Sequence, residues 1–144
     1  MQPARTSRTP AQLFALAFGG VYILVGLVGF AVTGFRDFAS DTSTRLLIFD
    51  INPLHNLVHL AIGLALVVGA TRAVTASRVN LAIGAAYLAV AVVGLTGVLQ
   101  FLSINSGVVP DFWLHVASGI ALVAFARGWA RMEARSTTSA PSAR

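Results

Sequence analysis

Uncharged, mostly apolar residues fill four long stretches of the chain. These stretches cover residues 9–35, 51–71, 79–110 and 112–126. A helix of about 20 apolar residues crosses the hydrocarbon core of a bilayer, and about 17 suffice at the short end. The pattern therefore predicts an all-α integral membrane protein, a four-helix bundle. Its transmembrane helices are expected near 12–34, 53–71, 79–102 and 111–128, the last one continuing past Arg127.

The composition agrees with a chain that lies largely in lipid. Hydrophobic residues make up 56% of the 144 residues and charged residues only 10%, against about 25% charged residues in an ordinary soluble domain. There is no cysteine, which excludes disulfides and iron–sulfur clusters. The first apolar run is too long for the core of a cleaved signal peptide, so we expect it to remain as a helix.

Positive charge is distributed unevenly over the predicted loops. Eight of the ten basic residues, all arginines, fall in the two tails and in the loop between the second and third helices. Only Arg36 and Arg45 fall on the other side. This positive-inside bias predicts a multi-pass protein of the bacterial inner (cytoplasmic) membrane with both termini in the cytoplasm, in contact with lipid and not with nucleic acid. We expect residues 1–11 to be a cytoplasmic N-terminal tail and residues 129–144 a disordered cytoplasmic tail.

Two sequence patterns occur twice. The segment 59–63, His-Leu-Ala-Ile-Gly, recurs 56 residues later as 115–119, His-Val-Ala-Ser-Gly. The segment 19–29, Gly-x-x-Tyr followed by Gly, recurs 65 residues later at 84–94. Each unit crosses the membrane twice, so the copies share one orientation, as in a parallel repeat about the membrane normal. The chain is therefore predicted to consist of two tandem, similar hairpins, covering residues 12–71 and 79–128.

Small residues on one face of a membrane helix let neighbouring backbones approach closely. At about 100° per residue, the first predicted helix carries such a face from Ala15 to Thr33. The second carries Ala61 and Ala65 for the same purpose, and the fourth carries Ala117. The residues expected to mediate helix packing are Gly19, Gly26, Gly29, Gly63, Ala65, Gly69 and Gly119.

Polar side chains gather at the outer end of the predicted bundle. Asn52 is a good cap for the second helix, with Pro53 in its first turn, and Asp111 is available to cap the fourth. Polar groups that cannot face lipid should face one another, so an outer-leaflet polar pocket is expected. Its predicted members are Asn52, His55, Asn56, His59, Thr96, Gln100, Asp111, His115 and Ser118.

Two neighbouring features leave alternatives open. Thr96 and Gln100 lie opposite the 84–94 face of the third helix, so one of these faces must point to lipid or to another protein. The external loop contains the apolar run 46–49, which we expect to anchor at the membrane interface. Capping of the polar pocket by this run is the alternative.

The histidines have two interpretations. In the first, they hydrogen-bond across helices and fix the register of the bundle, with no cofactor. In the second, His59 and His115 are an axial pair for haem b, each followed four residues later by glycine. A divalent metal held by His55, His59, His115 and Asp111 is the other version of this hypothesis.

Other functional classes lack their chemistry. The spacing of Asp111 and His115 suits a proton relay, but no charged residue continues a path through the inner half. Unbroken helices argue against a transporter site, and no nucleophile motif supports hydrolysis. We therefore expect a protein that is not an enzyme.

The segment 52–63, Asn-Pro-Leu-His-Asn-Leu-Val-His-Leu-Ala-Ile-Gly, resembles a known family. The family comprises small four-helix membrane proteins, common in actinobacteria and catalogued as a domain of unknown function, with an Asn-x-x-His-Asn-x-x-His-Leu-x-x-Gly segment on helix 2. Its Asp-x-x-x-His segment on helix 4 is matched by residues 111–115. The resemblance spans all four predicted helices and implies a polytopic inner-membrane protein without established activity. It marks Asn52, Asn56, His59, Asp111 and His115.

Three function hypotheses follow. The first is a non-enzymatic membrane component or accessory subunit that meets a larger membrane complex, or further copies of itself, within the bilayer. The second is a haem- or metal-binding protein that uses His59 and His115 for electron transfer. The third is a lipid- or quinone-binding pocket under the external loop.

Overall fold

The computed structural model describes the backbone of residues 7–138 and the side chains as far as residue 128. The described part is almost entirely helical, which confirms the all-α prediction. It contains two short strands, β1 and β2, and one 3₁₀ turn, η1. In chain order, the elements are α1 (Pro10–Thr33), β1 (Arg45–Leu46), β2 (Phe49–Asp50), α2 (Pro53–Gly69), α3 (Ala73–Gly94), η1 (Gln100–Leu102) and α4 (Pro110–Thr138).

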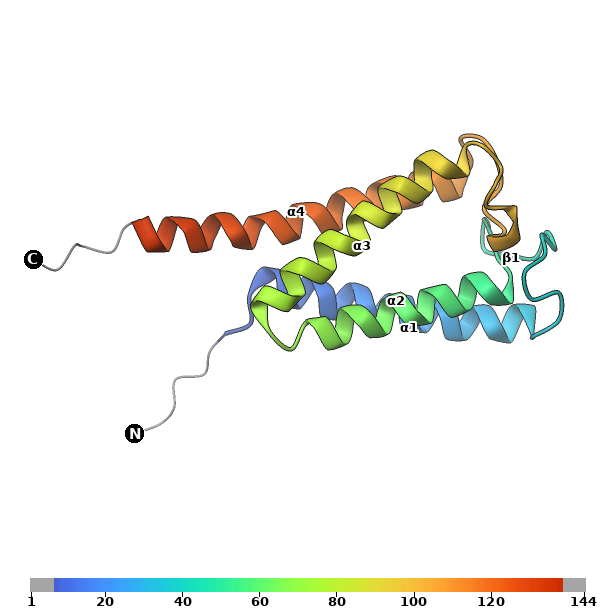
Figure 1. Cartoon of the computed structure of the whole chain (residues 1–144). Helices are drawn as coiled ribbons and strands as arrows, with labels where there is room; N and C mark the ends of the chain where they lie inside the picture. The colour runs from blue at the N-terminus through green and yellow to red at the C-terminus, as the bar shows by residue number, and fades with distance from the viewer. Residues whose placement is uncertain (1–6, 139–144) are drawn as a thin grey trace, which may run out of the picture.

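The helices pack in two pairs. α1 packs mainly against α2, and α3 mainly against α4, while α1 also contacts α3 and α4 (Figure 1). The start of α1, the end of α4 and the α2–α3 connection lie at one end of the molecule, and the strands and η1 lie at the other (Figure 1). This second end is called the loop end below.

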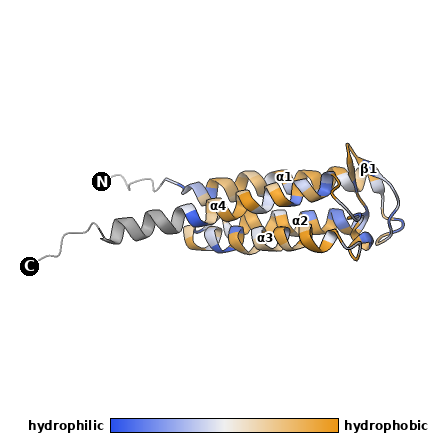
Figure 2. Ribbon diagram, turned by 90° about the horizontal axis from the view of Figure 1, so that it is seen from above, coloured by the Kyte–Doolittle hydropathy of each residue, from blue (hydrophilic) through white to orange (hydrophobic). Residues whose placement is uncertain are grey.

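Hydrophobic residues predominate along the coloured parts of all four helices, and hydrophilic residues gather mainly at the two ends (Figure 2). By length and composition, α1 and α3 are apolar enough to cross a membrane. α2, with 17 residues, is a shorter apolar helix. No other helix within the described residues meets the same test.

Local signals set the helix starts. Thr9 and Gln12 form a capping box at α1, in which each side chain accepts a hydrogen bond from the other residue's backbone N–H. At α2, Asn52 Oδ1 accepts from the backbone N–H of His55 at 2.8 Å, with Pro53 in the first turn. The predicted cap and proline position are therefore confirmed. α4 begins at Pro110, so Asp111 lies in its first turn and is not the cap.

The third helix was predicted over 79–102 but runs from Ala73 to Gly94. Its polar start stays helical because it packs: Ala76 is fully buried, and Ser77 Oγ donates to the carbonyl of Ala126 at 2.8 Å. Beyond Gly94, hydrogen bonds three residues apart tighten the chain, and Gly97, with φ 78°, turns it away.

The fourth helix continues past Arg127, as predicted, and is helical as far as Thr138, the last described residue. Residues 129–138 of the tail that was predicted to be disordered are therefore helical. The remaining part of this tail, 139–144, and residues 1–6 of the predicted N-terminal tail lie outside the described residues.

Glycines allow the backbones within each helix pair to touch. A Cβ on Gly19 would lie 2.8 Å from the carbonyl oxygen of Gly63, and one on Gly63 would lie 2.7 Å from that of Gly19. In the other pair, the same test gives 2.9 Å in both directions between Gly84 and Gly119. Real Cβ atoms do not approach so closely, so both contacts require glycine.

The small-residue face predicted on α1 is the face that packs. Its buried residues are Ala11, Ala15, Gly19, Tyr22, Gly26 and Gly29.

On α2 the prediction for Ala65 is wrong, because Ala61 and Ala65 are exposed. The packed stripe of this helix instead contains His59, Gly63 and Leu66, nearly opposite those alanines at about 100° per residue. Gly69 is buried, and a Cβ there would meet Val79 of α3 at 2.9 Å. Ala117 on α4 is likewise exposed.

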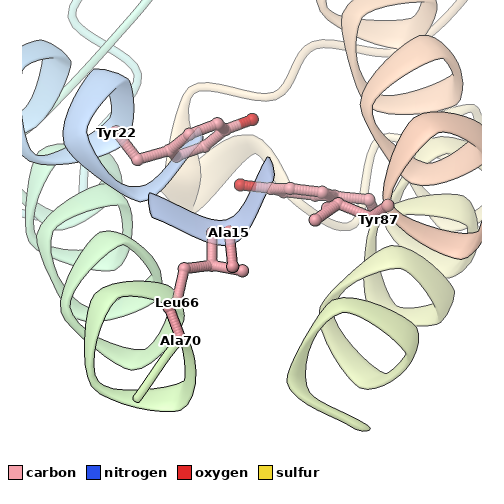
Figure 3. Close-up of a cluster of buried hydrophobic side chains, with 6 residues drawn as sticks. Ala15, Tyr22, Leu66, Ala70 and Tyr87 are labelled. Carbon is pink, nitrogen blue, oxygen red and sulfur yellow. The ribbon is translucent and has the colours of Figure 1, made fainter. Parts of the chain in front are cut away.

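Between the helix pairs lies a small cluster of buried side chains (Figure 3). Tyr22 of α1 and Tyr87 of α3 meet in its middle, with their hydroxyl groups pointing toward one another (Figure 3). The remaining members are small or aliphatic, so the two tyrosines place polar groups deep in an apolar core. The cluster comprises Ala15, Tyr22, Leu66, Ala70, Tyr87 and Leu122.

Candidate functional site

Five aromatic rings form a continuous chain of contacts toward the loop end. The ring centroids of His55 and His59 lie 4.5 Å apart, and those of His59 and Tyr22 5.0 Å. Tyr22 meets Tyr87 at 5.7 Å, and Tyr87 meets His115 at 5.3 Å. The chain therefore joins α2, α1, α3 and α4, and it brings the three histidines to one region.

The tyrosines were not among the predicted site residues. Tyr22 and Tyr87 each contact the histidine of their own helix pair edge-on, His59 and His115 respectively. The recurrence of Gly-x-x-Tyr at an offset of 65 residues was the signal that could have identified them. A tyrosine inside an apolar helix is otherwise easily taken for an ordinary core residue.

A cavity of about 270 Å³ lies between α1 and α4, and we call it the Tyr22 cavity. Its walls are mostly apolar, its polar members come from α1, α2 and α4, and the segment 46–51 closes one side. Its lining residues are Phe18, Val21, Tyr22, Val25, Leu46, Leu47, Phe49, Ile51, His55, His59, Asp111, Leu114, His115 and Ser118.

A second cavity, of about 200 Å³, lies between α2 and α3, and we call it the Tyr87 cavity. It shares the three histidines with the Tyr22 cavity, and apart from these and the tyrosine its walls are aliphatic. Its lining residues are His55, Val58, His59, Ile62, Ile83, Ala86, Tyr87, Val90, Leu102, Ile104 and His115.

The two cavities are lined by equivalent positions of the two helix pairs. The α1 residues of the Tyr22 cavity and the α3 residues of the Tyr87 cavity differ by 65 in number at every position: Phe18 and Ile83, Val21 and Ala86, Tyr22 and Tyr87, Val25 and Val90. The α2 residues of the Tyr87 cavity and the α4 residues of the Tyr22 cavity differ by 56 in number at every position: His55 and Asp111, Val58 and Leu114, His59 and His115, Ile62 and Ser118.

The same offsets relate polar contacts at the other end of the molecule. Gln12 Nε2 donates to the carbonyl of Ala70 at 2.9 Å, and Ser77 Oγ donates to that of Ala126 at 2.8 Å. Gln12 and Ser77 are 65 residues apart, and the two alanines are 56 apart. Equivalent residues therefore make equivalent contacts along the length of both pairs.

Several buried polar atoms have no hydrogen-bond partner among the described residues. Three of them belong to cavity-lining side chains: His55 Nδ1, His59 Nδ1 and Tyr87 Oη. The others are Asn56 Oδ1, Asn80 Oδ1 and Ser103 Oγ. A buried polar group without a partner costs about 1–3 kcal/mol. Three such atoms belong to residues that line one cavity, so an occupant that pairs with them would remove this cost.

Two predicted pocket residues have structural contacts elsewhere. Asn52 is fully buried, and its Nδ2 donates to the carbonyls of Ser40 and Phe101, at 3.0 and 2.8 Å. Asn52 therefore holds both outer loops to the start of α2. Asn56 packs against Gly29, and its Nδ2 donates to Thr33 Oγ1 at 3.0 Å. Neither asparagine lines a cavity.

Thr96 and Gln100 lie outside the cluster, because both are exposed. Thr96 Oγ1 donates to the carbonyl of Val93 at 2.6 Å, within its own turn. The packed face of α3 is the one that carries Gly84 and Tyr87. The alternative that the sequence left open is settled in favour of this face.

Asp111, His115 and Ser118 all lie in the wall of the Tyr22 cavity. His115 Nδ1 lies 2.6 Å from the backbone carbonyl of Asp111. A carbonyl only accepts, so Nδ1 carries the proton, and Nε2 is the acceptor of the neutral ring.

The segment between α1 and α2 covers the Tyr22 cavity. Its strands form a two-stranded antiparallel hairpin, in which Arg45 Nε donates to Asp50 Oδ1 at 2.8 Å. This hydrogen bond and the charge of Asp50 raise the pKa of Arg45. Asn105 of the other outer loop donates to the second oxygen of Asp50 at 3.1 Å. The apolar run 46–49 thus contributes to the cavity wall, in agreement with the capping alternative.

The metal hypothesis receives no support from the geometry. In the part of the chain that the structure describes, no group of three or more His, Asp or Glu side chains is placed to hold a metal ion. His55, His59 and His115 do line common cavities, but they do not converge with Asp111 on one point as metal ligands would.

Comparison with known proteins gives one match. Residues 12–127 match a family model described as a domain of unknown function (DUF4383), which confirms the resemblance to a family of that kind. No curated protein and no solved structure matches the chain.

Proposed function

The chain belongs to the DUF4383 family, whose function is unknown, and on that premise we propose that it is a multi-pass membrane component that binds a small amphipathic molecule from the bilayer. The binding sites are the Tyr22 and Tyr87 cavities. The protein carries out no reaction of its own in this role. It meets larger partners, or further copies of itself, within the bilayer, because helices with exposed apolar faces make up most of the described chain.

The exterior of the molecule supports four membrane spans. Soluble monomers rarely expose large contiguous apolar patches, yet large apolar side chains are exposed along every helix. α2, at about 1.5 Å per residue, reaches about 25 Å, which is near the short limit for a span. The arginine distribution supports a cytoplasmic location of both termini. Examples of the exposed residues are Leu13, Leu24, Leu64, Val68, Leu81, Val92, Ile120 and Phe125.

The spans are tested by labelling introduced cysteines, since the natural chain has none. We expect Ser106→Cys to react with an impermeant maleimide added outside intact cells, and Thr71→Cys to react only after the cells are opened. Reaction of both variants from the same side would contradict the proposed orientation.

The equivalent contacts support an internal duplication of a helical hairpin. The glycine pairs, the ring contacts, the cavity linings and the polar contacts with Ala70 and Ala126 all repeat at the same two offsets. The two units have the same orientation, so their pseudo-two-fold axis lies along the membrane normal. A duplication explains why the Tyr22 and Tyr87 cavities have equivalent walls and share the three histidines.

The observation that carries the binding proposal is the pair of equivalent cavities around three histidines. Polar and ionisable side chains inside a membrane are expensive and are generally functional. Apolar walls with a few convergent polar groups are typical of small-molecule sites. A molecule with an apolar body and a polar head would satisfy both the walls and the unpaired atoms of His55 and His59.

Mass spectrometry of organic extracts tests the binding proposal. The protein is purified in mild detergent as wild type and as two double variants. In one variant, Ser118→Phe and Ile62→Phe fill both cavities at equivalent positions. In the control, Ala117→Phe and Ala61→Phe add the same bulk at exposed, equivalent positions. Circular dichroism and thermal unfolding establish that each variant is folded.

We expect one lipid-soluble compound, enriched over the bulk membrane, in the wild type and in the control. The same compound should be lost from the filled variant. A wild-type protein with no enriched compound, or equal amounts in all three proteins, would contradict the proposal.

The haem hypothesis has one observation in its favour, because His59 and His115 line both cavities. Absorption spectra of the same preparation, oxidised and reduced with dithionite, test it. A Soret band that disappears in His59→Ala and in His115→Ala would identify a small cytochrome and replace the proposal above. A colourless protein with a bound lipid-soluble compound would support the proposal that the cavities bind an amphipathic molecule from the bilayer.

A further inference from the structure

The Tyr87 cavity is suited to an uncharged molecule. Its lining contains no Arg, Asp or Glu side chain. A phosphate head would need a cation or free backbone N–H groups. The nearby start of α2 does not supply them, because the N–H groups of Leu54, His55 and Asn56 are paired with Phe38 and Asn52. Phospholipid heads therefore find no partner here.

Three residues that line this cavity carry buried hydrogen-bonding atoms. His55 Nδ1, His59 Nδ1 and Tyr87 Oη lack partners among the described residues, and each of these residues is at most 8% exposed. A tyrosine hydroxyl donates or accepts, and a neutral imidazole nitrogen does one or the other, depending on its tautomer. A carbonyl or hydroxyl oxygen on the occupant pairs with either kind of group.

The size of the cavity limits what enters it. A volume of about 200 Å³ lies below the range of about 300–1,000 Å³ that is usual for sites enclosing a drug-sized molecule. It accommodates a ring but not a diacyl lipid. Ala86 lines the cavity and is also exposed on the outer surface of α3, so it marks the mouth. A chain attached to the ring would leave at this point into the bilayer.

We propose that the Tyr87 cavity binds the oxygen-bearing ring of a quinone or quinol. The ring lies between the aliphatic walls of α2 and α3, its oxygens pair with Tyr87 and the histidines, and its isoprenoid tail passes Ala86 into the lipid. The inference concerns binding only, without electron transfer to the protein. It rests on the proposed function, since it names the ligand class of one of the two cavities.

Isothermal titration of the full chain in detergent tests this inference. The probes are menadione, which is a methylated naphthoquinone, 2-methylnaphthalene, which is the same ring without oxygens, and a short-chain phosphatidylglycerol. We expect menadione to bind, and Tyr87→Phe to weaken it about 3- to 10-fold, as the loss of one hydrogen bond does. Binding of 2-methylnaphthalene should be weaker and unaffected by Tyr87→Phe.

A pair of mouth variants locates the site. Ala86→Trp should reduce menadione binding at least tenfold, because the added ring blocks the opening. Ala85→Trp, at the neighbouring exposed position of α3 that lines neither cavity, should leave binding within twofold. Both positions are exposed, so neither change disturbs the core.

The outcomes separate the two proposals. Binding of phosphatidylglycerol instead of menadione, blocked by Ala86→Trp, would overturn the quinone inference and leave the membrane-ligand proposal standing. Menadione binding that neither Tyr87→Phe nor Ala86→Trp changes would also overturn the inference. No binding of any probe, together with equal extracts from the wild type and the filled variant, would overturn both.

Discussion

The two helix pairs are alike along their middle and differ at the loop end. In both, glycines bring the backbones together, through Gly19 and Gly63 in one pair and Gly84 and Gly119 in the other. Toward the loop end, a Cβ on Gly29 would overlap Asn56, whereas one on the equivalent Gly94 would meet only Ile104, at 3.1 Å. The shared part is what close packing requires. The contacts that differ lie closer to the loop end, where the two outer loops also differ in length.

The two cavities likewise have equivalent backbone positions but different side chains. Where the Tyr22 cavity has Asp111 and Ser118, the Tyr87 cavity has His55 and Ile62 at the equivalent positions. The longer first loop adds the segment 46–51 to the Tyr22 cavity. One backbone frame therefore presents a more polar, covered site beside a largely aliphatic one. We expect the two sites to differ in ligand preference more than in shape.

The largest loss of stability is expected at the glycine contacts that the two helix pairs share. Gly63→Ala should lower the free energy of unfolding by about 2 kcal/mol, because the new Cβ meets backbone that cannot move aside. Gly119→Ala should cost nearly as much, because its Cβ would lie 2.9 Å from the carbonyl oxygen of Gly84. SDS titration followed by circular dichroism measures both. Gly20→Ala is the control, with nothing within 4 Å of its Cβ. A loss of stability in only one of these two variants would contradict the equivalence of the two glycine contacts.

A smaller loss of stability should distinguish one helix pair from the other at the loop end. Gly29→Ala displaces the Asn56 side chain and breaks its hydrogen bond to Thr33, which should cost about 1 kcal/mol. Gly94→Ala at the equivalent position needs only a small shift of Ile104 and gains helix propensity, so the stability should be nearly unchanged. The same SDS titration measures the difference. Equal losses in the two variants would show that the loop ends are not distinct in the way described.

The smallest effect is expected at the exposed ion pair of the first loop. Arg45→Ala removes one of the two hydrogen-bond partners of Asp50, but Arg45 is exposed to solvent, and such pairs contribute little. We expect the thermal midpoint in detergent to stay within about 1 °C of the wild type. Ligand extraction should also be unchanged, since Arg45 does not line a cavity. A large drop in either would mean that the hairpin 45–50 closes the Tyr22 cavity through this pair.

Much of the fold could be predicted from the sequence, because long apolar stretches and helical periodicity carry the signal. The α1 face from Ala15 to Gly29 has a single arrangement of small residues, so its packing was unambiguous. α2 has two candidate faces, one with Ala61 and Ala65 and one with His59 and Gly63. Periodicity alone cannot rank them. Contact with Gly19 decides between them, and it is a tertiary contact.

The errors at the loop end have a similar cause. Thr96 and Gln100 were assigned to the pocket by continuing the third helix to residue 102. The helix ends at Gly94, and after that point the count of about 100° per residue no longer places side chains. The start of α3 was missed because charge marks where a helix leaves lipid and not where it begins.

The site was predicted in part. His55, His59, Asp111, His115 and Ser118 lie together at the cavities because each stands on a helix whose register the sequence defines. The cavities themselves lie between helix pairs, and their walls include residues such as Val21 and Ile83 that no polar signal marks. Only the relative placement of the helices reveals them.

The most direct test of the central claim is a high-resolution structure of the protein in a lipid nanodisc made from its native membrane lipids. We expect four helices crossing the disc, with ligand density in at least one of the two cavities, in hydrogen-bond contact with His55, His59 or Tyr87. Cavities closed by collapse of the surrounding side chains, with the three histidines bonded only to one another and to the backbone, would contradict it.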